Sequence, residues 1–191
     1  MTGFHVKTAL AAIAAFLVVA LALGGSLIVT GAYNVAADAP HTAFAHALIG
    51  YARERSIEVR ASAVVAPRLD DPKMIADGAS DYDAMCTGCH LAPGMPENEM
   101  RPGLNPKPPL LARGRAGHAA EEFWIIKHGI KMTAMPAWGL THSDAEIWNM
   151  VAFLQKLPAL SAVQYRALVA QSGDHHAHDH GDTPMDMSHM R

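Results

Sequence analysis

The chain has 191 residues, a length that allows one domain with appendages. Its formal net charge is only −3, and no stripe of basic residues is present, so the composition argues against nucleic acid as a partner. Half of the residues are hydrophobic, but they are unevenly distributed and define regions of different character.

The first region, residues 1–31, is predicted to be a transmembrane anchor. No charged residue occurs from Thr8 to Ile28, and about 21 helical residues span the ~30 Å hydrocarbon core of a bilayer. Lys7 precedes this run and Asp38 is the first charge after it, which favours a cytoplasmic N-terminus and an exported body. A signal peptide cleaved within residues 35–39 is the alternative, although its apolar core would be unusually long.

Residues 32–71 are predicted to form a stalk helix, at about residues 42–61, and a linker containing Pro67. The helix carries apolar residues together with a basic patch formed by Arg53, Arg55 and Arg60. The patch could contact lipid phosphate. The simpler interpretation, which we favour, is that the helix packs on the following domain or on a partner subunit.

Residues 72–158 have the pattern of a compact helical domain. Pro72 suits a first helical turn, and a helix is predicted over residues 73–85. The proline-rich stretch 92–117 should hold little regular structure. A second helix is predicted over residues 119–128, where Gly129 ends it.

The third core helix is marked by a capping box, in which Ser143 is the N-cap and Glu146 is the N3 residue. Apolar residues then recur at helical spacing until Pro158. Residues 159–172 are predicted to contain a short accessory helix, at about 162–170, that packs outside the core. The predicted fold class is therefore all-α.

The most informative motif is Cys86-Thr87-Gly88-Cys89-His90, which has the C-x-x-C-H pattern of covalent haem attachment. The two thiols add to the haem vinyl groups, and the adjacent histidine can ligate the iron. A disulfide or redox pair would need no following histidine, and a zinc site would need more ligands than His90 alone adds. The motif predicts one covalent haem c.

A second axial ligand is sought downstream, where Met135 precedes a proline in Thr133-Ala134-Met135-Pro136. Pro136 stiffens the loop and would help present a thioether at a fixed position. Met132 lies three residues earlier, and spacing alone does not decide between the two methionines.

From Pro72 to Pro158 the chain resembles the class I cytochrome c domains, most closely the monohaem domains of bacterial respiratory complexes and terminal oxidases. The resemblance implies three core helices around the haem, with His90 and Met135 as axial ligands and Cys86 and Cys89 as attachment points. It also implies that the carbonyl oxygen of a proline accepts a hydrogen bond from the ring N–H of His90. The candidate prolines are Pro108 and Pro109, then Pro93, and the candidate haem-packing aromatic residues are Tyr82, Trp138 and Trp148.

Methionine and histidine ligation raises the reduction potential and leaves no open site, so the resemblance implies one-electron transfer rather than stand-alone catalysis. The expected partners are a quinol-oxidising complex or dehydrogenase as donor and a terminal oxidase or soluble carrier as acceptor. The expected location is the periplasmic face of a bacterial inner membrane. A haem peroxidase or gas sensor with a labile sixth ligand is an alternative.

Residues 173–191 form a tail rich in histidine and methionine, for which disorder is predicted. Imidazole and thioether groups suit Cu(II) and Cu(I) respectively. The candidate copper ligands are His175, His176, His178, His180, Met185, Met187, His189 and Met190. A copper-binding redox protein is therefore a further functional alternative, while a solvated terminus or a purification tag would explain the tail without function.

Overall fold

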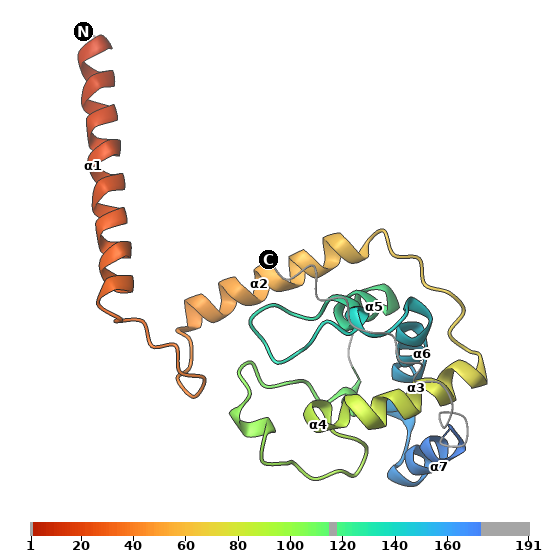
Figure 1. The fold of residues 1–191 in the computed structure, drawn as a ribbon. Helices are drawn as coiled ribbons and strands as arrows, with labels where there is room; N and C mark the ends of the chain where they lie inside the picture. Colours follow the sequence, from red (N-terminus) through yellow and green to blue (C-terminus); the bar gives the residue numbers. More distant parts are fainter. Residues whose placement is uncertain (1, 115–117, 173–191) are drawn as a thin grey trace, which may run out of the picture. The chain divides into compact units, whose positions relative to one another are not determined.

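The structure is a computed structural model that describes residues 2–114 and 118–172. In this part of the chain, all regular structure is helical, as predicted. The chain divides into two compact units between Pro40 and His41. The helices are α1 (Thr2–Val29), α2 (Ala43–Ala61), α3 (Pro72–Met85), α4 (Thr87–His90), α5 (Ala119–His128), α6 (Asp144–Leu154) and α7 (Ala162–Ser172) (Figure 1).

The first unit contains α1, whose apolar side chains are exposed around the helix, including Leu10, Phe16 and Leu21. Among the described residues, one helix is long and apolar enough to cross a membrane, and it spans His5–Val29. This helix covers the uncharged run of the sequence. A signal sequence near an N-terminus can pass the same test of length and composition, so retention or cleavage of α1 stays a prediction.

The second unit is built on the crossing of α3 and α6, which pack closely together. Gly78 of α3 makes the close approach possible, because a Cβ atom there would lie 2.0 Å from the backbone oxygen of Asn149. Beside the crossing, Tyr82 and Phe153 are almost fully buried, with ring centroids 5.2 Å apart. A second apolar cluster joins α5 to α6 through Phe123, Ile126, Ile147, Met150 and Val151.

The core helices α3 and α5 begin and end within one residue of their predicted bounds, and α6 begins where predicted. α6 ends at Leu154, before the predicted stop at Pro158, which lies in the 3-10 turn Leu157–Ala159. Asp71 caps α3 by accepting a hydrogen bond from the backbone N–H of Lys73 at 2.9 Å. Ser143 and Glu146 form the predicted capping box of α6, which satisfies backbone donors at the helix start. Gly129 follows α5 with a φ of 65°, a left-handed conformation that glycine adopts without strain.

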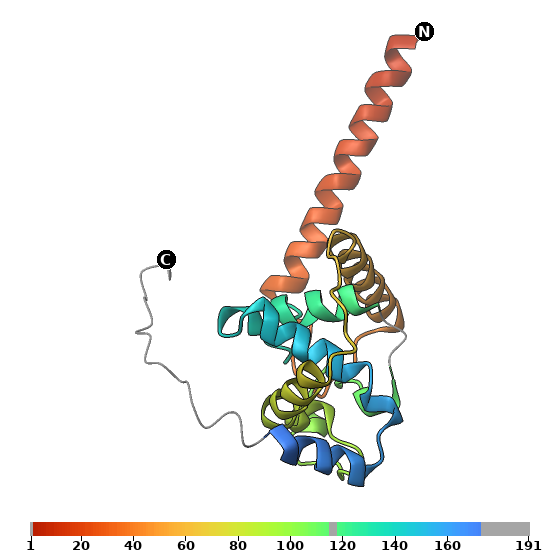
Figure 2. The same cartoon turned by 90° about the vertical axis from the view of Figure 1, so that its right-hand side faces the viewer.

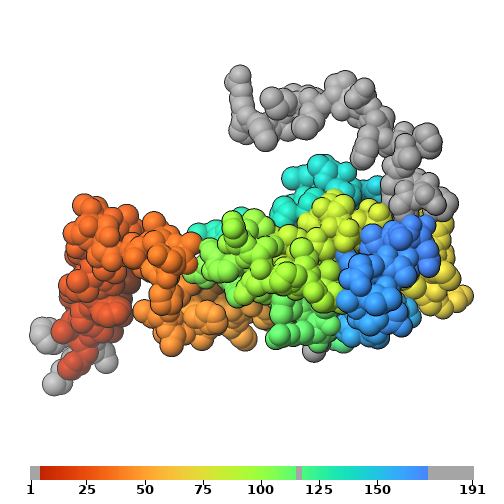
Figure 3. Space-filling model, turned by 90° about the horizontal axis from the view of Figure 1, so that it is seen from below, coloured from red at the N-terminus to blue at the C-terminus, as the bar shows by residue number. Residues whose placement is uncertain are grey.

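The prediction that the last helix packs outside the core is wrong. α7 lies along α3 (Figures 1 and 3), and its Tyr165 is 4% exposed within the Tyr82–Phe153 cluster. The Tyr165 hydroxyl donates a hydrogen bond to Asp83 Oδ1 at 2.6 Å. Burial is the main cause that raises the pKa of Tyr165, and this hydrogen bond is the second. The hydroxyl therefore keeps its proton and remains a donor. Through this bond, α7 is joined to the C-terminal part of α3.

α2 packs on α5 (Figure 2), in agreement with the favoured interpretation of the stalk helix. Its buried residues are Ile57 and Ala61. The opposite face carries Phe44, Leu48 and Tyr51, each more than half exposed. The helix is therefore part of the second unit and contributes only one of its faces to the core.

We predict that Gly78→Ala destabilises the protein by roughly 1–3 kcal/mol, because the added methyl group meets rigid backbone and pushes α3 from α6. Gly50→Ala is the matched control. It lies on α2, where a Cβ atom would have no neighbour within 4 Å, and it should stabilise by about 0.5–1 kcal/mol. Denaturant unfolding measures both, and a Gly78→Ala protein as stable as wild type would contradict the close crossing.

Candidate functional site

The site begins at the end of α3, where Cys86 ends one helix and starts another. The backbone N–H of His90 donates to the carbonyl oxygen of Cys86 at 2.8 Å, and that of Cys89 donates to the same oxygen at 3.1 Å. The short helix α4 therefore forms a tight turn. The turn directs Cys86, Cys89 and His90 into one cavity, which all three residues line.

The two cysteines are not joined by a disulfide. Burial, reinforced by nearby Asp81 and Cys89, raises the pKa of the Cys86 thiol to about 12. Reactive redox cysteines have lowered pKa values, so this environment argues against a thioredoxin-like pair. It suits the uncharged thioether that haem attachment would create.

In the described part of the chain, no three or more His, Cys, Asp or Glu side chains are arranged so that they could hold a metal ion together.

His90 is oriented by the proline-rich loop. Its Nδ1 lies 2.9 Å from the carbonyl oxygen of Pro109. A carbonyl oxygen can only accept, so Nδ1 carries the proton, and Nε2 of the neutral ring has the lone pair that a metal requires. The structure thus places the hydrogen bond at Pro109 rather than at Pro108 or Pro93. Such a bond fixes the ring and raises its basicity as a ligand.

Arg101 connects this loop to the turn formed by residues 86–90, which we call the attachment turn. The sequence analysis did not single out this residue. The side chain is 6% exposed and donates to the backbone oxygens of Cys89 at 3.0 Å and Pro108 at 2.6 Å. Its third contact is an ion pair with Glu97 at 2.8 Å. One guanidinium therefore fixes the turn that carries His90 and the loop that orients it.

Met135 lines the same cavity as His90. The backbone N–H of Met135 donates to Thr133 Oγ1 at 3.1 Å, and its carbonyl accepts from the N–H of Ile130 at 3.2 Å. Gly129 packs against this loop, where a Cβ atom would lie 2.7 Å from the Met135 oxygen. The loop is therefore held closed, with the thioether at the cavity wall.

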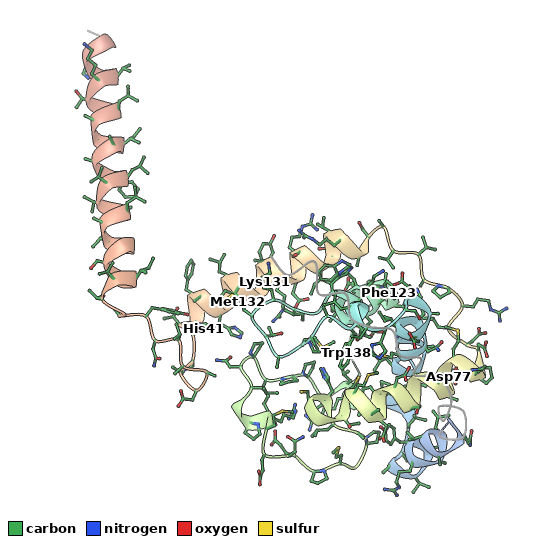
Figure 4. The ribbon with its side chains drawn as sticks, viewed as in Figure 1. His41, Asp77, Phe123, Lys131, Met132 and Trp138 are labelled. Carbon is green, nitrogen blue, oxygen red and sulfur yellow. The ribbon has the colours of Figure 1, made fainter. Side chains whose placement is uncertain are left out.

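Met132, the alternative ligand, does not line the cavity. It is 93% exposed, and Figure 4 shows it at the tip of the loop, away from Trp138. His128, a histidine close to this loop in sequence, is also exposed and does not line the cavity. Its ring lies beside Trp124, with ring centroids 5.0 Å apart. The arrangement favours Met135 as the sulfur ligand.

Of the three aromatic residues that the resemblance assigned to haem packing, only Trp138 lines the cavity. The assignment of Tyr82 and Trp148 to the cavity wall is not supported. Tyr82 is buried in the core, and its hydroxyl donates to the Leu91 oxygen at 2.6 Å. Trp148 stacks on Phe123, with centroids 4.2 Å apart. Both rings are accounted for by packing of the helices.

The cavity has a volume of about 410 Å³, within the range of roughly 300–1,000 Å³ typical of cofactor sites. It offers two thiols, an imidazole and a thioether within walls supplied largely by apolar side chains such as Leu111, Ile125, Ile126, Ile130 and Leu154. This donor set and this apolar surround fit a covalently attached haem. The proline-rich loop supplies one wall. Little regular structure was expected in this stretch, and it contains two short 3-10 turns, Arg101–Gly103 and Leu111–Arg113.

The comparison with protein families agrees with this geometry. Residues 73–154 match the family model of cytochrome C oxidase, cbb3-type, subunit III. This segment is a c-type cytochrome domain related to the cytochromes of oxidases. Its family implies covalent haem c and a haem-based electron-transfer role. α1, α2 and α7 lie outside the match.

No curated protein and no solved structure matches the chain. The copper ligands predicted in residues 173–191 lie outside the described residues, and the family comparison does not support copper.

We predict that Arg101→Met lowers the free energy of unfolding of the holoprotein by about 2–3 kcal/mol, because it removes charge-assisted hydrogen bonds from two backbone carbonyls. Arg68→Met is the control. The Arg68–Asp70 ion pair is largely exposed, and its loss should cost less than about 1 kcal/mol. Equal stabilities of the two variants in denaturant unfolding would show that Arg101 does not secure the site.

Proposed function

We propose that this protein is a membrane-anchored monohaem cytochrome c that transfers single electrons in a bacterial respiratory or periplasmic redox chain. Cys86 and Cys89 would hold the porphyrin, and His90 and Met135 would ligate the iron. The observation that carries the proposal is the gathering of these four side chains around one cavity, with His90 oriented by Pro109.

The residues around the cavity suit electron transfer better than substrate chemistry. When bound, haem c supplies a one-electron iron couple, whose potential methionine and histidine ligation raises. Met135 is held by the hydrogen bonds of its loop, so little reorganisation is needed at the sixth position. Leu111, Ile125 and Ile126 keep the cavity wall apolar and thereby restrict water. These features disfavour a peroxidase or a gas sensor, which need a vacant or labile sixth site.

The proposed location is supported by α1 and by the attachment chemistry, and the proposed partners are supported by the resemblance to oxidase cytochromes. We infer that α1 is an uncleaved anchor, because its apolar run exceeds the usual signal-peptide core. Lys7 before the span favours a cytoplasmic N-terminus, and haem attachment to c-type cytochromes takes place on the exported side. The donor would be a quinol-oxidising complex or dehydrogenase, and the acceptor a terminal oxidase or soluble carrier.

Replacement of the two methionines tests the assignment of the sulfur ligand. In the oxidised holoprotein, a methionine–iron bond gives a weak sulfur-to-iron charge-transfer band in the near-infrared. We expect Met135→Ala to lose this band and to lower the reduction potential, because a sulfur ligand that favours the reduced iron is removed. Met132→Ala should retain both properties, because Met132 points to solvent.

Loss of the band in Met132→Ala, with retention in Met135→Ala, would reverse the assignment. Absence of the band from wild-type holoprotein would contradict methionine ligation altogether.

A further inference from the structure

The stalk helix α2 supplies part of the cofactor cavity. Arg53, Glu54 and Ile57 line the cavity together with His90 and Met135. All three precede residue 73, where the family match begins. The matched segment therefore does not contain the whole wall of the site.

The cavity-facing position of Arg53 is set by the packing of α2. Arg53 and Ile57 are four residues apart and share one helical face, and Ile57 is only 3% exposed. Arg55 lies two residues further along, on another face, where it forms an exposed ion pair with Glu58 at 2.8 Å. The burial of Ile57 thus distinguishes two nearby arginines, one at the cavity and one at the surface.

Arg53 is one of two cations on the cavity wall. Besides His90 and the two cysteines, the ionisable lining residues are the cations Arg53 and Lys107 and the acids Glu54 and Glu122. Lys107 is paired with Glu97 at 2.5 Å, and Glu122 accepts a hydrogen bond from Gln155. Arg53 is only partly buried, with its side chain 37% exposed.

The guanidinium of Arg53 can bind a second carboxylate. Its Nε and Nη2 donate to a single oxygen, Glu54 Oε1, at 3.0 Å and 2.7 Å. A guanidinium has five N–H donors, so these two bonds leave donors for another acceptor. Its planar fork matches carboxylate geometry.

The chemistry of haem identifies this second carboxylate. The vinyl groups that react with cysteines and the two propionates lie on opposite edges of the porphyrin. Figures 1 and 2 show α2 and α4 on opposite sides of α5. Because α2 packs on α5 whereas α4 packs on α3, we expect the propionate edge of the porphyrin to lie toward α2 when its vinyl edge lies at α4.

We propose that Arg53 is a haem-binding residue whose guanidinium donates to a haem propionate, which makes α2 an integral part of the cofactor site. This inference rests on the proposed function, because it requires haem c in the cavity. A cation beside the haem stabilises the reduced iron relative to the oxidised iron. Arg53 therefore raises the reduction potential.

The test is the midpoint potential of the full-length holoprotein, measured by redox titration at fixed pH and ionic strength. Arg53→Met should lower the reduction equilibrium constant at least threefold relative to Arg55→Met, which is roughly 28 mV for a one-electron couple. Arg55→Met is the matched control, because it removes the same charge from the outer face of α2. Arg53→Lys keeps the charge and should remain within twofold of wild type.

Equal potentials of Arg53→Met and Arg55→Met, whether both unchanged or both lowered, would overturn the role of Arg53. If Arg53→Met does not accumulate as holoprotein, Arg53→Gln is measured in its place. Its reduction equilibrium constant should then be at least threefold lower than that of Arg53→Lys. Haem staining after denaturation is performed on every protein. Absence of covalent haem from the wild type would contradict the proposed function, whereas unchanged potentials with covalent haem present contradict only the role of Arg53.

Discussion

The hydrogen bond between His90 Nδ1 and the Pro109 oxygen is the contact on which the candidate haem site depends. It fixes the tautomer of the imidazole, and therefore which nitrogen can ligate iron. The bond joins two segments that have little regular structure between them, so something must hold them in register. Arg101 does this from a buried position, since it binds the carbonyls of Cys89 and Pro108, each next to one partner of the bond.

Helices outside the family match also help to hold the segments of the site in place. α7 reaches α3 through Tyr165, whose hydroxyl binds Asp83, and the Asp83 carbonyl accepts a hydrogen bond from Thr87 in the attachment turn. α2 closes the cavity on another side through Ile57. In the described part of the second unit, the segment that matches the cytochrome family is thus supported by helices before and after it. A fragment limited to residues 73–154 would lack both supports.

The sequence predicted the parts of this structure that depend on local chemistry. Gly129 predicts the C-terminal end of α5, and the Ser143–Glu146 capping box predicts the start of α6. The cysteine spacing predicts the attachment turn. The roles of Arg101 and Tyr165 could not be predicted, because their partners are distant or are backbone carbonyls that leave no sequence pattern. The choice between Met132 and Met135 needed the path of the loop, since both have the same chemistry and differ only in direction.

The closed sixth position is the central claim, because it separates an electron carrier from a haem enzyme or sensor. The most direct measurement is the visible absorption spectrum of the reduced full-length holoprotein before and after addition of carbon monoxide. With Met135 bound, the spectrum should remain unchanged at neutral pH, because the ligand must first leave the iron. Rapid and complete formation of a carbon monoxide complex would contradict the account and indicate an open or labile site.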